Sequence, residues 1–530
     1  MGASYPLLDS HALHTLLHAR FTEGFLSLKD LPKPSEFKDM DKATTRIIKA
    51  IENKENITII GDYDVDGVTA TTLMRLFFEE INYPIKSIIP NRFTDGYGLS
   101  ANLIPRIEGT DLAITVDNGI SAFYASQICQ EKGIELIITD HHLLPPTLPI
   151  AYAIIDQKQE DCHFPYDEVC GAQIAWYLIA SLKNALGIKL DMMAYMELSA
   201  IAIIADMMPL QHINRAMVQA GIKALNQSQR PAIRAFKEES KKEEITAEDI
   251  GFFLAPILNS AGRMEDASFA VDFLASSNIY DARIRLERLI GFNTLRKATE
   301  QDITDKAMKQ VNPKDEVIIV WGKDWHEGVV GIVSARVARH YEKPCIVLSH
   351  NDNGILKGSG RSFGVCDLFS IVDGCREHLE KFGGHEAAIG LSLQENRLEA
   401  FKTQVQEEYK KRNYSKQIVD PEILGELAFK DIDFDLTAMM KTYEPYGQGN
   451  TRPKFISKNV QVLEASSMGK EGEHLRFSFA QEGFIFKAVK FKSTAQFTQG
   501  ESLSISYTIN ENHFRGNTSL QLMLDKLWRE

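Results

Sequence analysis

The sequence predicts an α/β protein made of a parallel-sheet domain, a helical connector, a second α/β unit and a C-terminal β-barrel. From residue 40 to about 155, short apolar and β-branched runs alternate with helical segments, which implies a parallel sheet covered on both faces. Residues 171 to about 312 are mostly helical in pattern. After about residue 455, short alternating strands separated by Gly and Asn are typical of a small antiparallel barrel or sandwich.

The first α/β unit contains the strands that matter most for function. We expect strands at 57–61, 112–117, 135–140 and 151–155, with helices at 68–81 and at about 121–132. Functional residues in such sheets collect at the carboxyl ends of the strands. Three of these strands end in an aspartate, which is the first indication of a site.

The remaining elements follow in chain order. The charged stretch 278–311 is interrupted by Gly291 alone and predicts a long connecting helix. A second α/β unit begins with a strand at 317–322, continues through 344–350 and ends at about 415. The segments HLRFSF, FIFKAVKF and SLSISYTI alternate as strands do and predict the final barrel.

Composition excludes several classes of protein. With 530 residues, 44% hydrophobic and 25% charged, the chain is typical of a globular protein of roughly three or four domains. The six cysteines contain no CxxC pair, so we expect reduced thiols. A net charge of −13 argues against nucleic acid as a partner, because proteins that bind phosphate are usually basic.

No segment is typical of a signal peptide or a membrane span. The N-terminus lacks a basic region followed by an apolar run. The most apolar stretch, 198–210, is too short to cross a bilayer and contains Asp206. We therefore expect a cytoplasmic monomer without membrane association.

The segment GDYDVDG places Asp62, Asp64 and Asp66 two residues apart, directly after a buried strand. Alternate side chains of an extended backbone share a face, so the three carboxylates should converge, and Gly67 should let the chain turn into the next helix. A divalent cation would remove their mutual repulsion. A lone motif of this kind is more often a solvated acidic turn or a helix cap.

Other strand ends strengthen the interpretation as a metal site. Asp117 and the triplet Asp140-His141-His142 each end a predicted strand of the same sheet. Asp206 lies within the apolar run IAIIADMMPL, where an unpaired charge is costly to bury, although it could instead cap a following helix. This oxygen-rich set with imidazole suits two Mn²⁺ or Mg²⁺ ions and predicts metal-dependent hydrolysis of phosphoesters.

GDYDVDG, the strand-end Asp117 and the DHH triplet resemble the DHH phosphoesterase superfamily. Later motifs are similar to those of its RecJ exonuclease family: NRFTDGYGLS with Arg92, LAPILNSAGRM with Arg263, and ADMMPL with Asp206. HEGVVGIVSARV, KGSGRS and FGGHEAAIGLSL resemble the DHHA1 domain, which in this superfamily binds substrate across a cleft from the metals. EPYGQGNTRPKF resembles the RecJ junction to a final OB-fold, which binds single strands.

The resemblance implies a single-strand-specific DNA exonuclease of repair and recombination, which acts 5′→3′ and releases 5′-mononucleotides. It implies that two Mn²⁺ or Mg²⁺ ions are held by Asp62, Asp64, Asp66, Asp117, His141 and Asp206. Asp140 would fix the tautomer of a histidine and His142 would contact the scissile phosphate. The terminal 5′-phosphate would be held by Arg92, Arg263, Ser359, Arg361 and His385.

Two other functions stay open on the residues alone: a DHH nuclease for short RNA or cyclic dinucleotides, and an inactive single-strand-binding scaffold. The expected partners are single-stranded DNA and, as candidates, a single-strand-binding protein or a helicase. Expected boundaries are an N-terminal extension (1–40), the DHH catalytic domain (41–225), the helical region (226–312), the DHHA1 domain (313–420), and the junction with the OB-fold (421–530).

Two positions depart from the RecJ pattern. Asp156-Gln157-Lys158 stands where these proteins usually have Asn-Pro, and Ile257 replaces a commonly basic residue. The first could alter a loop near the metals and the second could remove a substrate contact. In the barrel we expect about half of the aromatic side chains to fill the core, so none is assigned to base stacking: Phe477, Phe479, Phe484, Phe486, Phe491 and Phe514.

Overall fold

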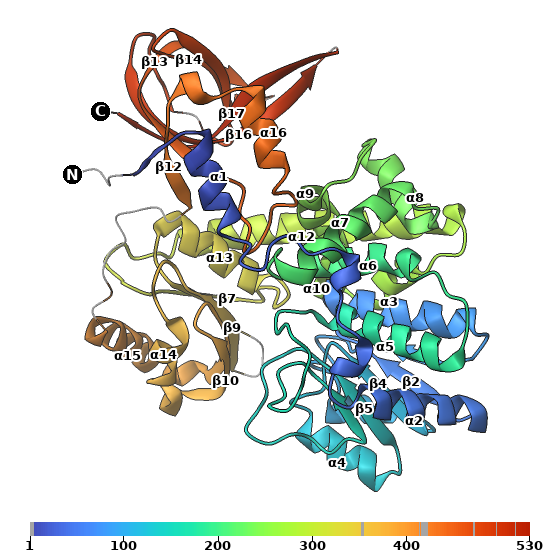
Figure 1. The fold of residues 1–530 in the computed structure, drawn as a ribbon. Coiled ribbons are helices and arrows are strands. Elements are labelled where there is room, and N and C mark those ends of the chain that lie inside the picture. Colours follow the sequence, from blue (N-terminus) through green and yellow to red (C-terminus); the bar gives the residue numbers. More distant parts are fainter. Residues whose placement is uncertain are drawn as a thin grey trace.

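The computed structural model describes residues 5–350, 354–412, 414, 422–469, 472–493, 495–514 and 516–529. Figure 1 shows the first α/β unit in blue and cyan beside green helices, with the second α/β unit and the barrel on the other side. The long helix α12 (Ile279–Met308) connects the two sides, as the charged stretch 278–311 predicts.

The first sheet is parallel throughout and its strand order is β3-β2-β4-β5-β6. Its strands are β2 (Ile57–Ile60), β3 (Lys86–Ile88), β4 (Leu112–Val116), β5 (Glu135–Thr139) and β6 (Ala153–Ile155). One face packs in a core with α2 (Met40–Asn53), α3 (Val65–Glu80) and α5 (Gly171–Leu186). The other packs with η3 (Ala101–Ile107) and α4 (Phe123–Glu131), so both faces are covered as predicted.

The helical region continues the core of the first sheet rather than forming a separate one. The hydrophobic cluster on the α2–α3–α5 face of the sheet also contains buried side chains of this helical region, as far as Leu289. The helices beyond α5 are α6 (Met192–Ala205), α7 (His212–Gln227), α8 (Pro231–Ser240), α9 (Ala247–Asp249), η4 (Ile250–Leu254), α10 (Ala255–Met264) and α11 (Ser268–Leu274). Packing in one core gives the first sheet a rigid support on this side.

The second α/β unit has a mixed sheet of order β10-β11-β9-β8-β7. Its strands are β7 (Ile318–Lys323), β8 (Cys345–His350), β9 (Ile355–Arg361), β10 (Leu379–His385) and β11 (Ala388–Gln394). Only β7 and β8 pair in parallel among them. The helices of this unit are α13 (Val330–Tyr341), α14 (Leu368–Asp373) and α15 (Leu398–Lys411).

The C-terminal strands close a five-stranded barrel, which excludes the sandwich. The strands are β13 (Lys454–Met468), β14 (His474–Gln481), β15 (Phe484–Lys490), β16 (Ser502–Phe514) and β17 (Asn517–Arg529). Closure comes from pairing of β13 with β16, and β15–β17 is a parallel pair in an otherwise antiparallel barrel. Phe477 and Phe479 fill the core with the partly buried Phe486, whereas Phe484 and Phe491 are exposed. The side chain of Phe514 lies outside the described residues.

The N-terminal segment packs into the barrel although the two are far apart in the sequence. Strand β1 (Leu7–Leu8) pairs in parallel with β12 (Ile423–Leu427), and α1 (Ser10–His18) packs against α16 (Phe434–Lys441). Leu13 and Leu17 are fully buried in the barrel core. Short 3₁₀ turns complete the secondary structure at 28–30, 34–36, 376–378, 395–397 and 429–431.

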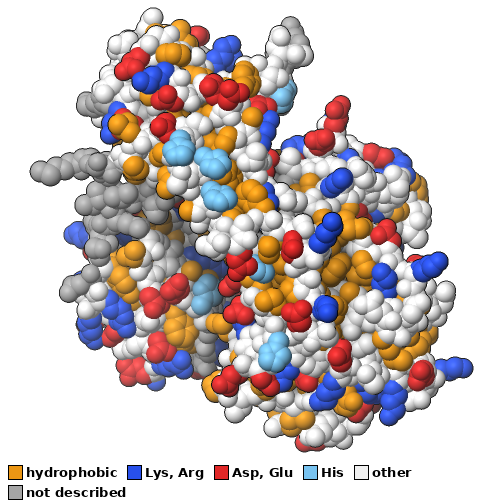
Figure 2. Space-filling view, viewed as in Figure 1, with side chains coloured by type: hydrophobic (Ala, Val, Ile, Leu, Met, Phe, Trp, Pro, Cys, Tyr) orange, Lys and Arg blue, Asp and Glu red, His pale blue; other side chains and the backbone are white. Residues whose placement is uncertain are grey.

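Acidic and basic side chains are mixed over the face of the molecule shown in Figure 2. The net charge of −13 is therefore not concentrated in one patch on that face. In the described part of the chain, no helix has both the length and the apolar character needed to cross a membrane.

Candidate metal centre and phosphate-binding cavity

The first three aspartates converge because the chain enters a helix. Asp62 follows β2, whereas Asp64 is the N-cap of α3 and Asp66 lies in its first turn. The Asp64 carboxylate accepts hydrogen bonds from the backbone N–H groups of Asp66 (3.0 Å) and Gly67 (3.2 Å). The prediction that they alternate along an extended backbone is therefore wrong, because the helix begins at Val65.

Two glycines allow the metal-site segments to approach each other. Gly67 lies within α3 rather than at a turn, and a Cβ there would lie 2.5 Å from the backbone nitrogen of Asp62. A Cβ on Gly171 would lie 2.4 Å from the Cβ of Asp117. Both distances are shorter than real contacts allow, so close backbone approach, and not turn formation, requires glycine here.

The end of a helix or strand also positions the carboxylates of Asp66, Asp117 and Asp206. Asp117 follows β4 in the left-handed region (φ 63°). Asp66 accepts hydrogen bonds from Gly171 N–H (2.6 Å) and Ala172 N–H (2.8 Å) at the start of α5. Asp206 is the C-cap of α6, not an N-cap, and the negative end of the helix dipole disfavours a carboxylate there unless a cation is present.

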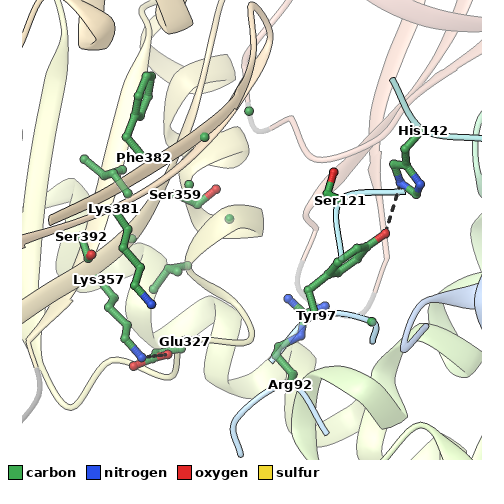
Figure 3. Close-up of a pocket in the computed structure, with 18 of the residues that line it drawn as sticks. Arg92, Tyr97, Ser121, His142, Glu327, Lys357, Ser359, Lys381, Phe382 and Ser392 are labelled. Atoms are coloured by element: carbon green, nitrogen blue, oxygen red, sulfur yellow. Dashed lines mark hydrogen bonds and ion pairs between the residues drawn. The ribbon is translucent and has the colours of Figure 1, made fainter. Parts of the chain in front are cut away.

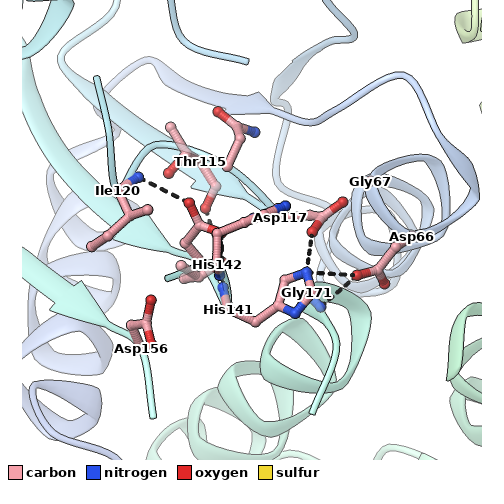
Figure 4. A network of polar contacts seen from close by, with 12 residues as sticks. Asp66, Gly67, Thr115, Asp117, Ile120, His141, His142, Asp156 and Gly171 are labelled. Carbon is pink, nitrogen blue, oxygen red and sulfur yellow. Dashed lines mark hydrogen bonds and ion pairs between the residues drawn. The ribbon is translucent and has the colours of Figure 1, made fainter. Parts of the chain in front are cut away.

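His141 lies at the centre of the cluster, as Figure 4 shows. Its Nε2 is 3.1 Å from Asp117 Oδ1 and 3.7 Å from both Asp66 Oδ2 and Asp206 Oδ2. Three overlapping groups have ligand atoms close enough to share an ion: Asp117–His141–His142, Asp66–His141–Asp206, and Asp62–Asp64–Asp117. All six residues predicted as metal ligands therefore lie together.

The donor set fits divalent cations. Asp62 Oδ1 and Asp206 Oδ2 are buried and have no hydrogen-bond partner in the described part of the chain. Burial and the neighbouring carboxylates raise the pKa of Asp62 well above its ordinary value and that of Asp206 to about 9. Burial lowers the pKa of His141 to about 4, which keeps its imidazole neutral and able to ligate. Bound cations would relieve this repulsion.

The Asp140 carboxylate contacts the imidazole ring of His142, whereas from His141 it accepts only the backbone N–H. Asp140 Oδ1 lies 2.6 Å from His142 Nδ1, and Oδ2 accepts the N–H of Ile120 at 2.9 Å. Burial would lower the pKa of His142, but the contact with Asp140 outweighs it and raises the pKa to about 9. Asp140 belongs to none of the three ligand groups, so its position is that of a residue orienting a histidine.

A cavity of about 1060 Å³ lies between the first sheet and the second α/β unit. Arg92, Tyr97 and His142 line it from the first unit, and residues of β9–β11 line it from the second, as Figure 3 shows. Tyr97 Oη lies 3.2 Å from His142 Nε2. His142 thus connects the carboxylate cluster to the cavity.

Three arginines of the cavity form no ion pair with any described residue: Arg92, Arg263 and Arg361. Arg263 donates to the carbonyl of Gly328 (3.1 Å), and burial together with the nearby Arg92 lowers its pKa to about 10. Arg361 donates to Ser359 Oγ at 2.7 Å. Arginines held together without carboxylates are suited to binding an anion such as phosphate.

The structure brings four of the five predicted phosphate ligands to this cavity. Arg92, Arg263, Ser359 and Arg361 line it. His385 does not, since it ends β10 and is exposed, two strands away from Arg361 in the same cross-strand register. Its contact with phosphate stays a prediction.

Sequence reasoning missed several residues near the site. Tyr97 stands in the quoted GYG motif without an assigned role, and Lys357 precedes Ser359 by two residues, so strand alternation could have indicated it. Lys158 donates to the backbone carbonyl of His141, and Asp156 is buried with its Oδ2 unpartnered. Ile257 packs against the helical core and makes no side-chain polar contact.

Family models match the three expected domains in order. The DHH family N-terminal domain matches residues 56–203, the DHHA1 domain 314–411, and the RecJ OB domain 423–526. The single-stranded-DNA-specific exonuclease RecJ of Haemophilus influenzae is 31% identical over 99% of this chain and 96% of its own length. The chain belongs to the RecJ family. RecJ of Escherichia coli is 30% identical over 95% of this chain and 92% of its own.

Solved structures of RecJ proteins share the fold. The RecJ of Thermus thermophilus in complex with Mn²⁺ covers 99% of this chain and 80% of its own, with a TM-score of 0.84 at 24% identity. A second RecJ exonuclease, bound to manganese, covers 72% of this chain and 96% of its own, with a TM-score of 0.63 at 27% identity.

Proposed function

We propose that this chain is a metal-dependent exonuclease that degrades single-stranded DNA from the 5′ end and releases 5′-mononucleotides. The RecJ relatives carry single-stranded-DNA specificity in their names. The observation that supports the chemistry best is the carboxylate–histidine cluster beside a cavity whose arginines lack carboxylate partners. The cluster suits phosphodiester hydrolysis, and the arginines suit capture of a terminal phosphate.

Six residues would hold two Mn²⁺ or Mg²⁺ ions: Asp62, Asp64, Asp66, Asp117, His141 and Asp206. Such ions, when bound, activate water and neutralise charge on the phosphate and the leaving oxygen. Mn²⁺ suits the mixed set of carboxylates and imidazole. The unpartnered carboxylate oxygens and the raised pKa values of Asp62 and Asp206 support this assignment.

His142 and Asp140 would act on the scissile phosphate as a pair. The Asp140 contact orients the ring and raises the pKa of His142 to about 9, which favours the protonated imidazolium. Its Nε2 is directed to the cavity, where it meets Tyr97 Oη. A cation at this position would contact a phosphate oxygen and stabilise the charge that develops there.

The 5′→3′ polarity would follow from the arginines and the serine that line the cavity. Arg92, Arg263, Ser359 and Arg361 would bind the terminal 5′-phosphate, with His385 joining from the end of β10. A terminal phosphate carries more charge than an internal diester, so an arginine-lined site favours strand ends. The cavity lies between two rigid units, which would admit a single strand more readily than a duplex.

The decisive assay uses purified protein with Mn²⁺ and long DNA labelled at the 5′ or the 3′ end, in single-stranded and duplex forms. We expect labelled mononucleotides from the 5′ end first, and only from single strands. Release from the 3′ end first, or equal rates on duplex, would contradict the proposal. Parallel reactions with dinucleotides and cyclic dinucleotides test the alternative function, because a DHH nuclease for short substrates would cleave these and leave long single strands intact. Absence of cleavage on every substrate would favour the inactive scaffold.

The proposed biological setting is DNA repair and recombination. A strand-end exonuclease needs exposed single strands, so repair and recombination intermediates are suitable substrates. A single-strand-binding protein or a helicase would supply them. The monomeric state and the cytoplasmic location stay predictions from the sequence.

A further inference from the structure

The strands of the second sheet arrange the cavity wall in rows. Arg361 on β9 pairs with Ala388 on β11, which pairs with His385 on β10. Two residues away, Ser359 pairs with Gly390, which pairs with Gly383. Residues paired across antiparallel strands point to the same face, so these rows hold the predicted phosphate ligands.

A third row continues the same face. Lys357 pairs with Ser392, and Ser392 pairs with Lys381. All three residues line the cavity. Because strands rise by about 3.4 Å per residue, the third row lies roughly 7 Å beyond the Ser359 row.

In the row between the lysines and Arg361, only Ser359 carries a side chain, because the two positions paired with it across the sheet are Gly390 and Gly383. A Cβ added to Gly383 or Gly390 would meet no atom within 4 Å, so the space above this row is open. A phosphate chain could lie directly against the backbone here. The row that contains Lys357 and Lys381 is therefore separated from the row that contains Arg361 by one row made of Ser359 and two glycines.

The ammonium groups of Lys357 and Lys381 in the third row are accessible to an anion. Lys381 is exposed and forms no ion pair with a residue that the structure describes. Lys357 has one carboxylate near it, Glu327 Oε2 at 3.5 Å, and its side chain is 53% exposed. That separation is too long for a strong hydrogen bond, so a phosphate could displace Glu327 from Lys357.

The position of the row decides what it could bind. In Figure 3, Lys357, Lys381 and Ser392 lie on the side of Ser359 away from His142. If the terminal phosphate occupies the Ser359–Arg361 rows, the strand runs from there toward His142. A group at the lysines would then lie beyond the 5′ end and be joined to the terminal phosphate itself.

We propose that Lys357, Lys381 and Ser392 form a second phosphate subsite, with which the enzyme accepts single strands that end in a 5′-diphosphate or 5′-triphosphate. This inference rests on the proposed function. The bond broken is the same P–O3′ bond of the first internucleotide link. Water adds to phosphorus, the 3′-oxygen leaves with a proton, and the products are a nucleoside 5′-polyphosphate and a strand shortened by one nucleotide with a 5′-phosphate.

The test compares one oligonucleotide with a 5′-triphosphate, a 5′-monophosphate or a 5′-hydroxyl, with Mn²⁺ and the full-length protein. The first product is identified by chromatography, and kcat/KM is measured for each end. We expect wild-type protein to release nucleoside triphosphate from the first substrate. In the double variant Lys357→Gln/Lys381→Gln, the ratio of kcat/KM for triphosphate over monophosphate ends should fall about tenfold or more.

Two further variants test whether a change in this kcat/KM ratio is specific to the proposed subsite. Lys410→Gln removes an exposed lysine of α15 that does not line the cavity, and should leave the ratio unchanged. Glu327→Gln removes the competing carboxylate and should raise the ratio. A double variant with an unaltered ratio, or wild-type protein that cuts monophosphate ends but refuses triphosphate ends, would overturn the subsite. Failure to cut any of the three ends would instead count against the proposed function.

Discussion

At the scale of single residues, the metal centre is a source of instability in the protein without metal. Asp62, Asp66 and Asp117 are each only 1% exposed, and their neighbours are other carboxylates. Burial of like charges raises the pKa values of Asp62 and Asp117 well above the ordinary range. Such a cluster is expected only where function requires it, because packing gains nothing from it.

Asp117→Asn should show that the buried carboxylate of Asp117 lowers the stability of the metal-free protein but is needed for cleavage. The neutral amide removes one buried charge, so the metal-free protein should unfold at a higher temperature than wild type. Cleavage should fall by more than about a hundredfold, and Mn²⁺ should stabilise the variant less. Thermal unfolding with and without Mn²⁺, beside the nuclease assay, measures all three. Unchanged cleavage would show that the cluster is misassigned.

Arg361→Gln tests the phosphate site. Loss of a charge-assisted contact of about 1.5–3 kcal/mol should lower kcat/KM for 5′-phosphorylated strands by roughly 10–100-fold. Strands with a 5′-hydroxyl should be affected much less. The ratio of kcat/KM for the two ends reports the effect, and equal losses on both would assign Arg361 to general structure. Arg376→Gln, at an exposed position outside the cavity, is the control.

Asp156 should make stability depend on pH. Burial raises its pKa from 3.8 to about 7, so the folded state disfavours ionisation that the unfolded chain allows. The resulting penalty grows as pH rises from about 4 to about 7 and is constant above. Asp156→Asn should therefore stabilise the fold by roughly 2–4 kcal/mol at pH 8, less at pH 5, and not below pH 3. Denaturant unfolding at the three pH values checks this, and a constant gain would contradict it.

At the scale of elements, helix and strand ends build the site. The start of α3 places Asp64, the start of α5 binds Asp66, and the end of α6 carries Asp206. The carboxyl ends of β4 and β5 supply Asp117 and the DHH triplet. Because these ends belong to one packed core, their relative positions are fixed before any metal binds.

Gly291→Ala and Gly67→Ala should change the stability of the protein in opposite directions. Gly291 lies in α12, and a Cβ there would meet nothing within 4 Å, so Gly291→Ala should stabilise the protein by about 0.5–1 kcal/mol. Gly67→Ala places a Cβ against the backbone of Asp62, and should destabilise the fold and reduce cleavage. Denaturant unfolding of both variants measures the contrast, and a stable, active Gly67→Ala would contradict the close-approach argument.

At the scale of the whole molecule, the N-terminal segment packs into the C-terminal barrel. Leu8, Leu13 and Leu17 of the N-terminal segment lie in the core of the barrel formed by residues more than 400 positions away. The segment also contacts the helices that pack with the first sheet, because the guanidinium of Arg215 in α7 lies 4.3 Å from the ring centroid of Phe25. The barrel is thus held by both ends of the chain.

Leu17→Ala should therefore weaken the barrel. Leu17 is fully buried, so truncation should cost about 2–4 kcal/mol, whereas the neighbouring Leu16, 42% exposed, should tolerate Ala with little change. Denaturant unfolding and binding of long single strands measure stability and barrel function together. Equal stability of the two variants would show that the N-terminal segment contributes nothing to the barrel core.

The net charge of −13 does not describe the surface that a strand would meet. Five carboxylates of the metal cluster contribute to it, and two divalent ions would offset four of those five charges. The cavity wall instead presents Arg92, Arg263 and Arg361 without carboxylate partners among the described residues. Local charge, and not the total, is the quantity relevant to binding.

The sequence predicts the strand–helix order, the long helix α12 and the strand-end acids, because hydrophobic periodicity and local spacing encode them. It also indicates candidate metal and phosphate residues, because each of them lies in a short contiguous motif. It does not predict that Asp140 orients His142, that Gly67 is needed for close approach, or that Lys357 and Lys381 share a row. Those relations depend on strand register and on contacts between distant segments, which no local pattern contains.

The amino-acid sequence by itself therefore determined the family, the order of the domains and the chemistry of the site residues. The tertiary structure alone decided which side chains meet: the five aspartates predicted as ligands gather near His141, arginines of two units line one cavity, and the N-terminal segment lies in the barrel core. The physical reason is that residue type and spacing act locally, whereas convergence of charges depends on how helix ends and strand ends pack in one core.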